Sequence, residues 1–193
     1  MKTVLPDIES FSFREEFGSE ILHDVEEAER NRPDLDRFIR SRPEKAVIAL
    51  DLRGLEYIGY SYSKPTVRTP LRRQSSGEYG DRHIILLSEE QDDFLDGIET
   101  ALSEEGMAVL VASSADDPLS DIKPIGEVKP HLMETFEVVR ESAPATTAEV
   151  ASRLGQSVQN ANNRLRSLDE LGLIRREKVS SPSGGQEWQV RVL

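Results

Sequence analysis

The sequence contains no cysteine and only three histidines. Without cysteine the chain has no disulfide bonds, no thiolate nucleophile and no cysteine-based zinc or iron–sulfur site. His23, His83 and His131 are far apart, and no two of them have the spacing of metal ligands. The sequence also has no Gly-x-Gly-x-x-Gly motif, no P-loop and no Ser, His and Asp residues at the spacing of a known catalytic triad. We therefore expect no metal, no cofactor and no enzymatic activity.

Long hydrophobic runs are also missing. The longest apolar stretches, residues 46–50 and 107–112, have the length of strands, whereas a membrane-spanning helix needs about 20 apolar residues. The first seven residues have no apolar stretch of the kind that a signal peptide requires. We therefore expect a cytoplasmic protein that does not contact a membrane.

Charge is unevenly distributed along the chain, which has 24 basic and 36 acidic residues and a net charge of −12. Residues 1–127 hold 15 basic and 28 acidic residues, a net −13, whereas residues 128–193 hold 9 and 8, a net +1. This difference predicts two units with different surfaces. The proline-bearing stretch 123–130 lies at the change, so we expect one domain over residues 1–123 and another over 130–193.

The first half has the pattern of an α/β domain. Apolar runs at residues 46–54, 82–88 and 107–112 are typical of buried strands. Residues 92–102 have the 3.6-residue apolar period and the acidic first turn of a helix. Strand, helix and strand in this order predict a parallel βαβ unit.

A further helix is expected upstream, beginning after Ser19. Its apolar face would carry Ile21, Leu22 and Val25, and Pro33 would break it.

Two stretches in the first half resemble STAS domains. Residues 51–61, Asp-Leu-Arg-Gly-Leu-Glu-Tyr-Ile-Gly-Tyr-Ser, are similar to the strand-and-turn signature of that fold, and residues 13–19 resemble a STAS-like variant found fused to other modules in prokaryotes. The resemblance implies a mixed sheet with helices and a role in sensing or assembly through a protein partner. It also implies a phosphorylation site at Ser61, although Gly59 and Tyr62 depart from the family pattern. The alternative is that Ser61 only caps the turn.

One basic cluster stands out in the acidic half. It consists of Lys64, Arg68, Arg72 and Arg73. Contact with an anion or a nucleic acid is one interpretation, but such runs commonly balance neighbouring acids, so we favour a solvated helix face.

The second half predicts a helix-turn-helix. Pro130 suits a helix start, and the next helix begins with a capping box in which Thr146 is the N-cap and Glu149 reaches back. Gly155 ends that helix, and Ser157 caps a third one after a short turn.

A β-hairpin is expected after the third helix. Gly172 ends the helix, residues 173–179 read as a strand, and Trp188, Val190 and Val192 alternate with polar residues as in a half-buried strand. Three helices and a hairpin predict a winged helix.

The second half resembles prokaryotic winged-helix regulators of the MarR and ArsR kind. The similarity lies in residues 147–155 and 168–177, the latter reading Leu-Asp-Glu-Leu-Gly-Leu-Ile-Arg-Arg-Glu. The resemblance implies that the third helix lies in the major groove of DNA and that the hairpin follows the DNA backbone.

The chemistry of the third helix agrees with DNA binding. Amide side chains pair with adenine and arginine pairs with guanine, and no carboxylate lies between residues 156 and 168 to repel phosphate. The residues that we expect to contact DNA are Ser157, Gln159, Asn160, Asn162, Asn163, Arg164, Arg166, Arg175, Arg176, Lys178 and Ser183. With a net charge of −12 the affinity has to come from local contacts, so we expect a homodimer that binds a repeated site on double-stranded DNA.

The sequence therefore predicts a DNA-binding transcriptional regulator. One alternative is a signalling or scaffold protein, similar to anti-sigma-factor antagonists, whose winged helix contacts protein. Another is an autoregulator of a defence system or of its own operon.

Overall fold

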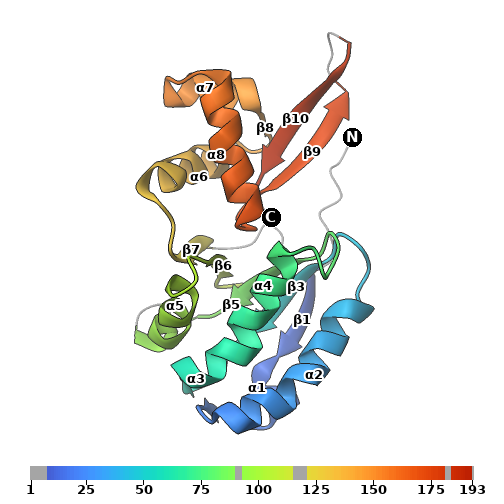
Figure 1. The fold of residues 1–193 in the computed structure, drawn as a ribbon, viewed down its shortest axis with the longest axis vertical. Coiled ribbons are helices and arrows are strands. Elements are labelled where there is room, and N and C mark those ends of the chain that lie inside the picture. The colour runs from blue at the N-terminus through green and yellow to red at the C-terminus, as the bar shows by residue number, and fades with distance from the viewer. Residues whose placement is uncertain (1–7, 90–92, 115–120, 181–183, 193) are drawn as a thin grey trace. The chain divides into compact units, whose positions relative to one another are not determined.

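The protein is described by a computed structural model covering residues 8–89, 93–114, 121–180 and 184–192. The chain divides into two compact units, unit 1 over Met1–Glu127 and unit 2 over Val128–Leu193 (Figure 1). Each unit has its own sheet and its own helices. The architecture is α/β, as the sequence predicts.

Unit 1 contains a five-stranded sheet with the order β1-β3-β5-β6-β7. The first four strands run parallel to their neighbours, and β7 is antiparallel to β6. The strands are β1 (Ile8–Ser12), β3 (Val47–Asp51), β5 (His83–Leu87), β6 (Ala108–Ala112) and β7 (Lys123–Gly126). All five residues of β3 are buried, which confirms the predicted buried strand.

The helices of unit 1 connect the parallel strands in order. Because parallel crossovers are right-handed, a sheet whose strands follow in sequence places the connecting helices on one face. The helical segments are α1 (Phe13–Phe17), α2 (Val25–Ser41), α3 (Tyr60–Ser63), a π-helical turn η1 (Lys64–Arg68), α4 (Thr69–Ser75), a 3₁₀ turn η2 (Asp93–Leu95) and α5 (Asp96–Ser103). Strand residues such as Ile48 and Ile84 form one apolar core with helix residues such as Leu35 and Leu102.

The predicted helix after Ser19 is wrong in two respects. Ile21–Leu22 forms a short strand, β2, which pairs in parallel with β4 (Tyr57–Ile58), and the helix starts only at Val25 with Asp24 as its N-cap. Pro33 does not break the helix, because it lies inside the continuous α2. Burial of Leu35 and Ile39 beyond the proline offsets the lost backbone hydrogen bond.

The helix after β4 is irregular and contains two prolines. Pro65 and Pro70 lack an N–H group, so they release backbone carbonyls from the regular ladder. Two hydroxyl groups also bond to the backbone of this segment: Thr66 donates to the carbonyl of Tyr62 at 2.7 Å, and Thr69 donates to that of Lys64 at 3.0 Å. The chain forms a π-helical turn at this point and then continues as α4.

The predicted junction at residues 123–130 is partly a strand. Lys123–Gly126 forms β7, so unit 1 extends to Glu127. Gly126 has a φ of +94°, and a Cβ there would lie 2.3 Å from the carbonyl oxygen of Met107. Glycine is therefore required where the edge strand β7 pairs with Ala108 of β6.

Unit 2 contains three helices and a three-stranded antiparallel sheet of order β8-β10-β9 (Figure 1). The elements are α6 (Pro130–Ser142), β8 (Ala145–Thr146), α7 (Thr147–Leu154), α8 (Val158–Glu170), β9 (Arg175–Ser180) and β10 (Gln186–Arg191). The predicted helices and both hairpin strands are confirmed, and the short β8 was not anticipated from the sequence.

The helix ends of unit 2 follow the predicted capping residues. Thr146 accepts from the Glu149 N–H at 3.3 Å, and the Glu149 carboxylate accepts from the Thr146 N–H at 2.7 Å, so the capping box is complete. Gly155 ends α7 in the left-handed conformation, and Ser157 caps α8. A three-residue turn therefore joins α7 to α8.

Candidate nucleic-acid interface

The outer face of α8 carries the amide side chains that the sequence places there. Gln159, Asn160 and Asn163 are exposed, and Arg166 follows them on the same side with 71% of its side chain exposed. The opposite side of the helix packs into the core of unit 2. The buried apolar residues of unit 2 are Leu132, Phe136, Val139, Ala145, Val150, Ala151, Ala161, Leu165, Leu168, Leu173, Ile174 and Val190.

The start of α8 is held in a defined geometry. Ser157 accepts a hydrogen bond from the N–H of Asn160 at 3.2 Å, and the Asn160 side-chain amide donates to Oε1 of Gln156 at 2.7 Å. These contacts fix the first turn and hold two amides side by side. The first charged side chain along this face is that of Arg166, which pairs at 2.9 Å with the exposed carboxylate of Glu170, one turn further on the same face.

Arg164 does not belong to this exposed stripe, which corrects the prediction that it contacts DNA. Its side chain is only 14% exposed and reaches α6, where it donates to the carbonyl of His131 at 3.2 Å and pairs with Glu134 at 3.0 Å. The physical reason is its position three residues after buried Ala161, on the flank of the buried stripe. Arg164 joins α8 to α6.

Arg175 is also misplaced by the sequence prediction. It is buried at the start of β9, with 6% of the residue exposed. A side chain in that position is not available for DNA phosphates, so the predicted contact is wrong.

Arg176 and Asn162 face each other rather than the outside. Arg176 donates to Oδ1 of Asn162 at 2.6 Å, a bond that links β9 to α8. Burial lowers the pKa of Arg176, and burial also raises the pKa of Asp169 although the charge and the backbone N–H of Arg176 act against that shift. Asp169 and Arg176 thus support the joint between α8 and β9. Only part of the Arg176 side chain is available to a ligand.

The hairpin presents two further side chains. Lys178 is exposed, as expected for a phosphate contact, and its ammonium group lies 5.3 Å from the ring centre of Trp188. The Arg176 guanidinium lies 4.6 Å from the same ring. Trp188 is 38% exposed. The alternating pattern predicts its strand, but it does not predict that two cations lie close to its ring. Ser183 lies outside the described residues.

Val158 is a second residue that sequence reasoning missed. It is 54% exposed in the first turn of α8, beside the amide stripe. Its signal in the sequence is its position directly after the cap Ser157, where a helix residue points away from the core.

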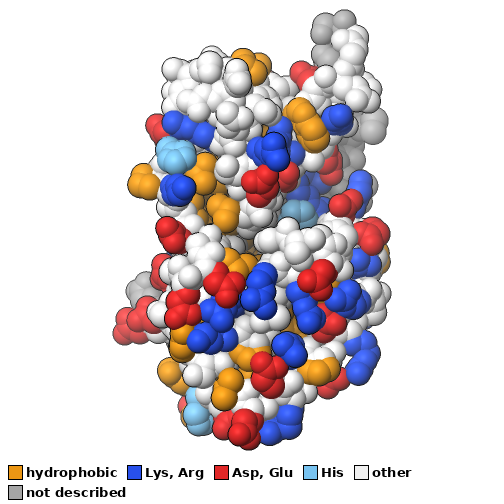
Figure 2. Space-filling model, viewed as in Figure 1, with side chains coloured by type: hydrophobic (Ala, Val, Ile, Leu, Met, Phe, Trp, Pro, Cys, Tyr) orange, Lys and Arg blue, Asp and Glu red, His pale blue; other side chains and the backbone are white. Residues whose placement is uncertain are grey.

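The basic cluster of unit 1 is paired with acids, as the favoured interpretation predicts. Arg68 contacts Glu104 at 2.8 Å and Glu105 at 3.4 Å, and Lys64 and Arg72 contact the same two acids at 4.0 and 3.7 Å, respectively. Basic and acidic side chains are intermingled over this face of unit 1 (Figure 2).

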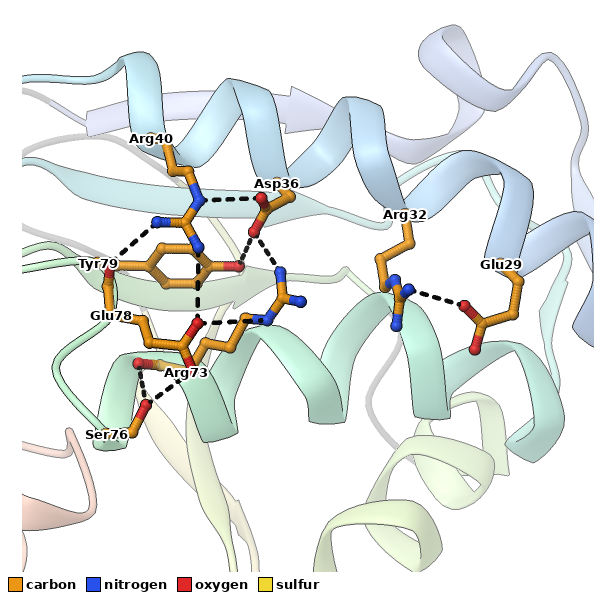
Figure 3. A network of polar contacts seen from close by, with 8 residues as sticks. All are labelled: Glu29, Arg32, Asp36, Arg40, Arg73, Ser76, Glu78 and Tyr79. Carbon is orange, nitrogen blue, oxygen red and sulfur yellow. Dashed lines mark hydrogen bonds and ion pairs between the residues drawn. The ribbon is translucent and has the colours of Figure 1, made fainter.

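Arg73 belongs to a separate network centred on Asp36 (Figure 3). The Asp36 carboxylate accepts from Arg73 at 2.6 Å, Tyr79 at 2.7 Å and Arg40 at 2.9 Å. Burial alone would raise the pKa of Asp36, but these hydrogen bonds outweigh it and leave the pKa below its ordinary value. The network ties α2 to α4 and is a structural feature.

Ser61 is exposed in the first turn of α3. The N-cap of that helix is Gly59, so the alternative in which Ser61 caps the turn is wrong. Phosphorylation of Ser61 stays a prediction.

A cavity of about 410 Å³ lies where β3 and β5 end in unit 1. Ligands of parallel sheets commonly bind at this edge. The cavity is lined by Leu52, Arg53, Gly54, Leu55, Glu56, Ser88, Glu89 and Phe94. Arg53 folds back onto Asp51 with two hydrogen bonds of 2.8 and 2.6 Å, so it is already engaged by a carboxylate.

In the described part of the chain, no three His, Asp or Glu side chains gather as a metal site. None of the helices described is both long and apolar enough to cross a bilayer.

No protein-family model matches the sequence, and no curated protein matches it. Among solved structures, a similar chain is that of the Aeropyrum pernix ORC1 protein in complex with DNA, at 12% identity. The alignment covers 98% of this chain and 75% of that chain, with a TM-score of 0.29. A TM-score of that size carries no argument about function, so the resemblances to STAS domains and to MarR and ArsR regulators stay predictions.

Proposed function

We propose that this protein is a transcriptional regulator that binds double-stranded DNA through unit 2, with α8 in the major groove and the β9–β10 hairpin along the backbone. One observation carries the proposal: Gln159, Asn160 and Asn163 form an exposed amide stripe that contains no carboxylate. Amides pair with the edge of adenine in the major groove, and phosphates tolerate no facing carboxylate.

The arrangement of the elements supports this placement. A three-residue turn joins α7 and α8, and a hairpin follows, which is the order of a winged helix-turn-helix. In that arrangement the second helix of the pair presents its N-terminal residues to the bases. Ser157, Gln159 and Asn160 occupy that end of α8.

The exposed groups also favour a base composition. An amide side chain selects adenine, and the methyl groups of Val158 suit the methyl group of thymine. The one arginine of the stripe, Arg166, lies two turns further along the helix. We therefore propose that the first two turns of α8 read A·T pairs and that Arg166 contacts a guanine or a phosphate.

The charge of the whole chain bears on the assembly. A net charge of −12 gives no long-range attraction to DNA, and a single helix with a single hairpin makes few contacts. A homodimer would double these contacts on a repeated site. The proposed active species is therefore a homodimer.

Site selection tests the proposal. The full-length protein would be used to select from random 20-base-pair duplexes, and the selected duplex would be titrated by fluorescence polarisation. Asn160→Ala and Asn163→Ala should each lose about 1–3 kcal/mol of discrimination at one base pair, since each removes one amide contact. Asn162→Ala is the matched control, because it removes an amide of the same helix that faces Arg176. It should leave the base preference unchanged.

Two results would contradict the proposal. One is the absence of any enriched DNA sequence with the dimeric protein. The other is an enriched sequence whose base preference is the same in the Asn160→Ala and Asn163→Ala variants. Either result would favour the alternative in which unit 2 contacts a protein.

A further inference from the structure

An exposed apolar patch lies on unit 1, far along the chain from α8. Ile21 and Tyr57 are 48% and 51% exposed, and they are paired directly in the short β2–β4 ladder. Directly paired residues of a ladder lie on the same face. Val25, at the start of α2, is 49% exposed and follows on the same chain segment. We call Ile21, Val25 and Tyr57 the apolar patch.

Buried residues hold the backbone of the patch in place. Leu22 and Ile58, the other pair of the ladder, are fully buried in the core of unit 1. A Cβ on Gly59 would lie 3.2 Å from the Tyr57 ring and 3.5 Å from the Cβ of His23. The Tyr57 ring therefore lies across Gly59, next to His23. Large side chains held in place while exposed to water mark interaction sites more often than scattered single ones do.

Acidic side chains accompany the patch. Glu20 precedes Ile21, Asp24 precedes Val25, and Glu56 precedes Tyr57. Among the ion pairs of the described residues, none involves Asp24 or Glu56, while Glu20 pairs with Arg14. The whole of unit 1 carries a net charge of −13. The Asp24 carboxylate caps α2 and has Arg30 nearby. Glu56 is therefore the carboxylate beside the patch with the most charge left to attract a cation.

The cavity at the ends of β3 and β5 adjoins the patch along the chain, although none of the three patch residues lines it. Glu56 lines that cavity and is the neighbour of Tyr57, and Glu89 contributes a second carboxylate. A volume of about 410 Å³ is sufficient for a long basic side chain. The cavity is also lined by Arg53, whose charge is paired with Asp51. An apolar surface and a cavity with two further carboxylates are thus adjacent along the chain segment 55–57.

We propose that unit 1 binds a basic polypeptide segment of another protein at this patch. An aliphatic side chain of the segment packs on Ile21 and Tyr57. A lysine or arginine enters the cavity near Glu56 and Glu89, and a second one lies near Asp24 or over the Tyr57 ring. A second copy of this chain is the less favourable occupant, because two identical acidic rims would face each other across a two-fold axis.

Peptide selection on the full-length protein tests the proposal. Random 12-residue peptides displayed on phage would be selected on the wild type and depleted on the Ile21→Ser/Tyr57→Ser double variant. The enriched peptides should combine lysine or arginine with an aliphatic residue. The best of them, synthesised with a fluorescent label, would then be titrated by polarisation.

Single variants then locate the binding surface. Tyr57→Ser and Glu56→Lys should each weaken binding of the labelled peptide at least tenfold. Val158→Ser and Glu141→Lys make the same kinds of change at exposed positions of unit 2 and should leave the affinity within twofold. Thermal unfolding of each variant would show that it is folded.

Four results of these experiments would contradict the proposal. No enrichment, enriched peptides without basic residues, or equal affinity for the wild type and Tyr57→Ser would overturn the proposal. A concentration-dependent dimer in sedimentation equilibrium that Tyr57→Ser dissociates would also overturn it, since the occupant would then be a second copy. The first three outcomes have no bearing on DNA binding by unit 2, whereas a dimer formed through the patch would supply the homodimer of the proposed function.

Discussion

The hydroxyl group of Tyr79 donates a 2.7 Å hydrogen bond to Oδ1 of Asp36, the same oxygen that accepts from Arg73 at 2.6 Å. Asp36 lies on α2 and Arg73 on α4, while Tyr79 comes from the loop that follows α4. Tyr79 is 1% exposed, so its hydroxyl has been withdrawn from water and depends on this carboxylate. The pair fixes the loop against two helices.

We predict that Tyr79→Phe lowers the free energy of unfolding by about 1–2 kcal/mol. The substitution removes one hydrogen bond to a charged group and leaves the ring packing intact. Urea unfolding followed by circular dichroism measures the change. Tyr57→Phe, which removes an exposed hydroxyl, is the control and should have no effect; equal stabilities of wild type and Tyr79→Phe would show that the bond contributes nothing.

The buried tyrosines also predict a loss of stability at high pH. Burial raises the pKa of Tyr62 and of Tyr79 to about 12 from the ordinary value of 10.0. The folded state therefore binds these protons more tightly, so their contribution is fully present below pH 10 and is lost as the pH rises from 10 toward 12. Urea unfolding at several pH values in that range should give a shallower decline for Tyr79→Phe than for the wild type, and an unchanged slope would contradict the assignment.

Arg164→Met should act on stability and not on DNA binding. The Arg164 guanidinium holds α8 to α6 through Glu134 and the carbonyl of His131, so its removal should cost about 1.5–3 kcal/mol. At temperatures where the variant is folded, the salt dependence of its DNA affinity should equal that of the wild type. A reduced salt dependence would mean that Arg164 contacts phosphate after all.

Arg166→Ala should have the opposite profile. The side chain is exposed and its ion pair with Glu170 lies within one helix, so stability should change by less than about 0.5 kcal/mol. If Arg166 contacts a phosphate, the slope of log K against log salt should fall by about 0.9. Arg37→Ala removes a similarly exposed, helix-paired arginine from unit 1 and should leave the slope unchanged.

Replacing thymine by deoxyuridine in the selected duplex tests the role of Val158. The change removes only the methyl group that the Val158 side chain is expected to contact. We expect at least one thymine whose replacement weakens binding by the wild type several-fold and has no effect on Val158→Ser. If every replacement is neutral for the wild type, the thymine contact is wrong while DNA binding itself is untouched.

Much of unit 2 could be predicted because local residues decide it. Ser157, Gly155 and the Thr146–Glu149 capping box set the helix ends through contacts within four residues. Arg164 could also have been placed from the sequence, because a position three residues after Ala161 and four before Leu168 flanks the buried stripe. The burial of Arg175 could not, because no local pattern around the start of β9 sets it apart from its exposed neighbours.

In unit 1 the errors fall on segments whose structure depends on distant partners. Strand β1 is an edge strand with polar residues, and it exists because Ile8–Ser12 pairs with β3, about forty residues away. Strand β7 contains Pro124, which an edge strand tolerates and a central strand does not. The Asp36 network has the same origin, since Asp36, Arg73 and Tyr79 are brought together only by the packing of α2 on α4.

The hydrogen bond between Asn162 and Arg176 has a consequence for any molecule that touches both α8 and the hairpin. Because the bond spans the two elements, their separation is set before a ligand arrives, and little motion remains to be frozen on contact. Loss of this hydrogen bond would leave every exposed group in place and still weaken binding. The unbound protein would then have conformational entropy that it must give up when the ligand binds.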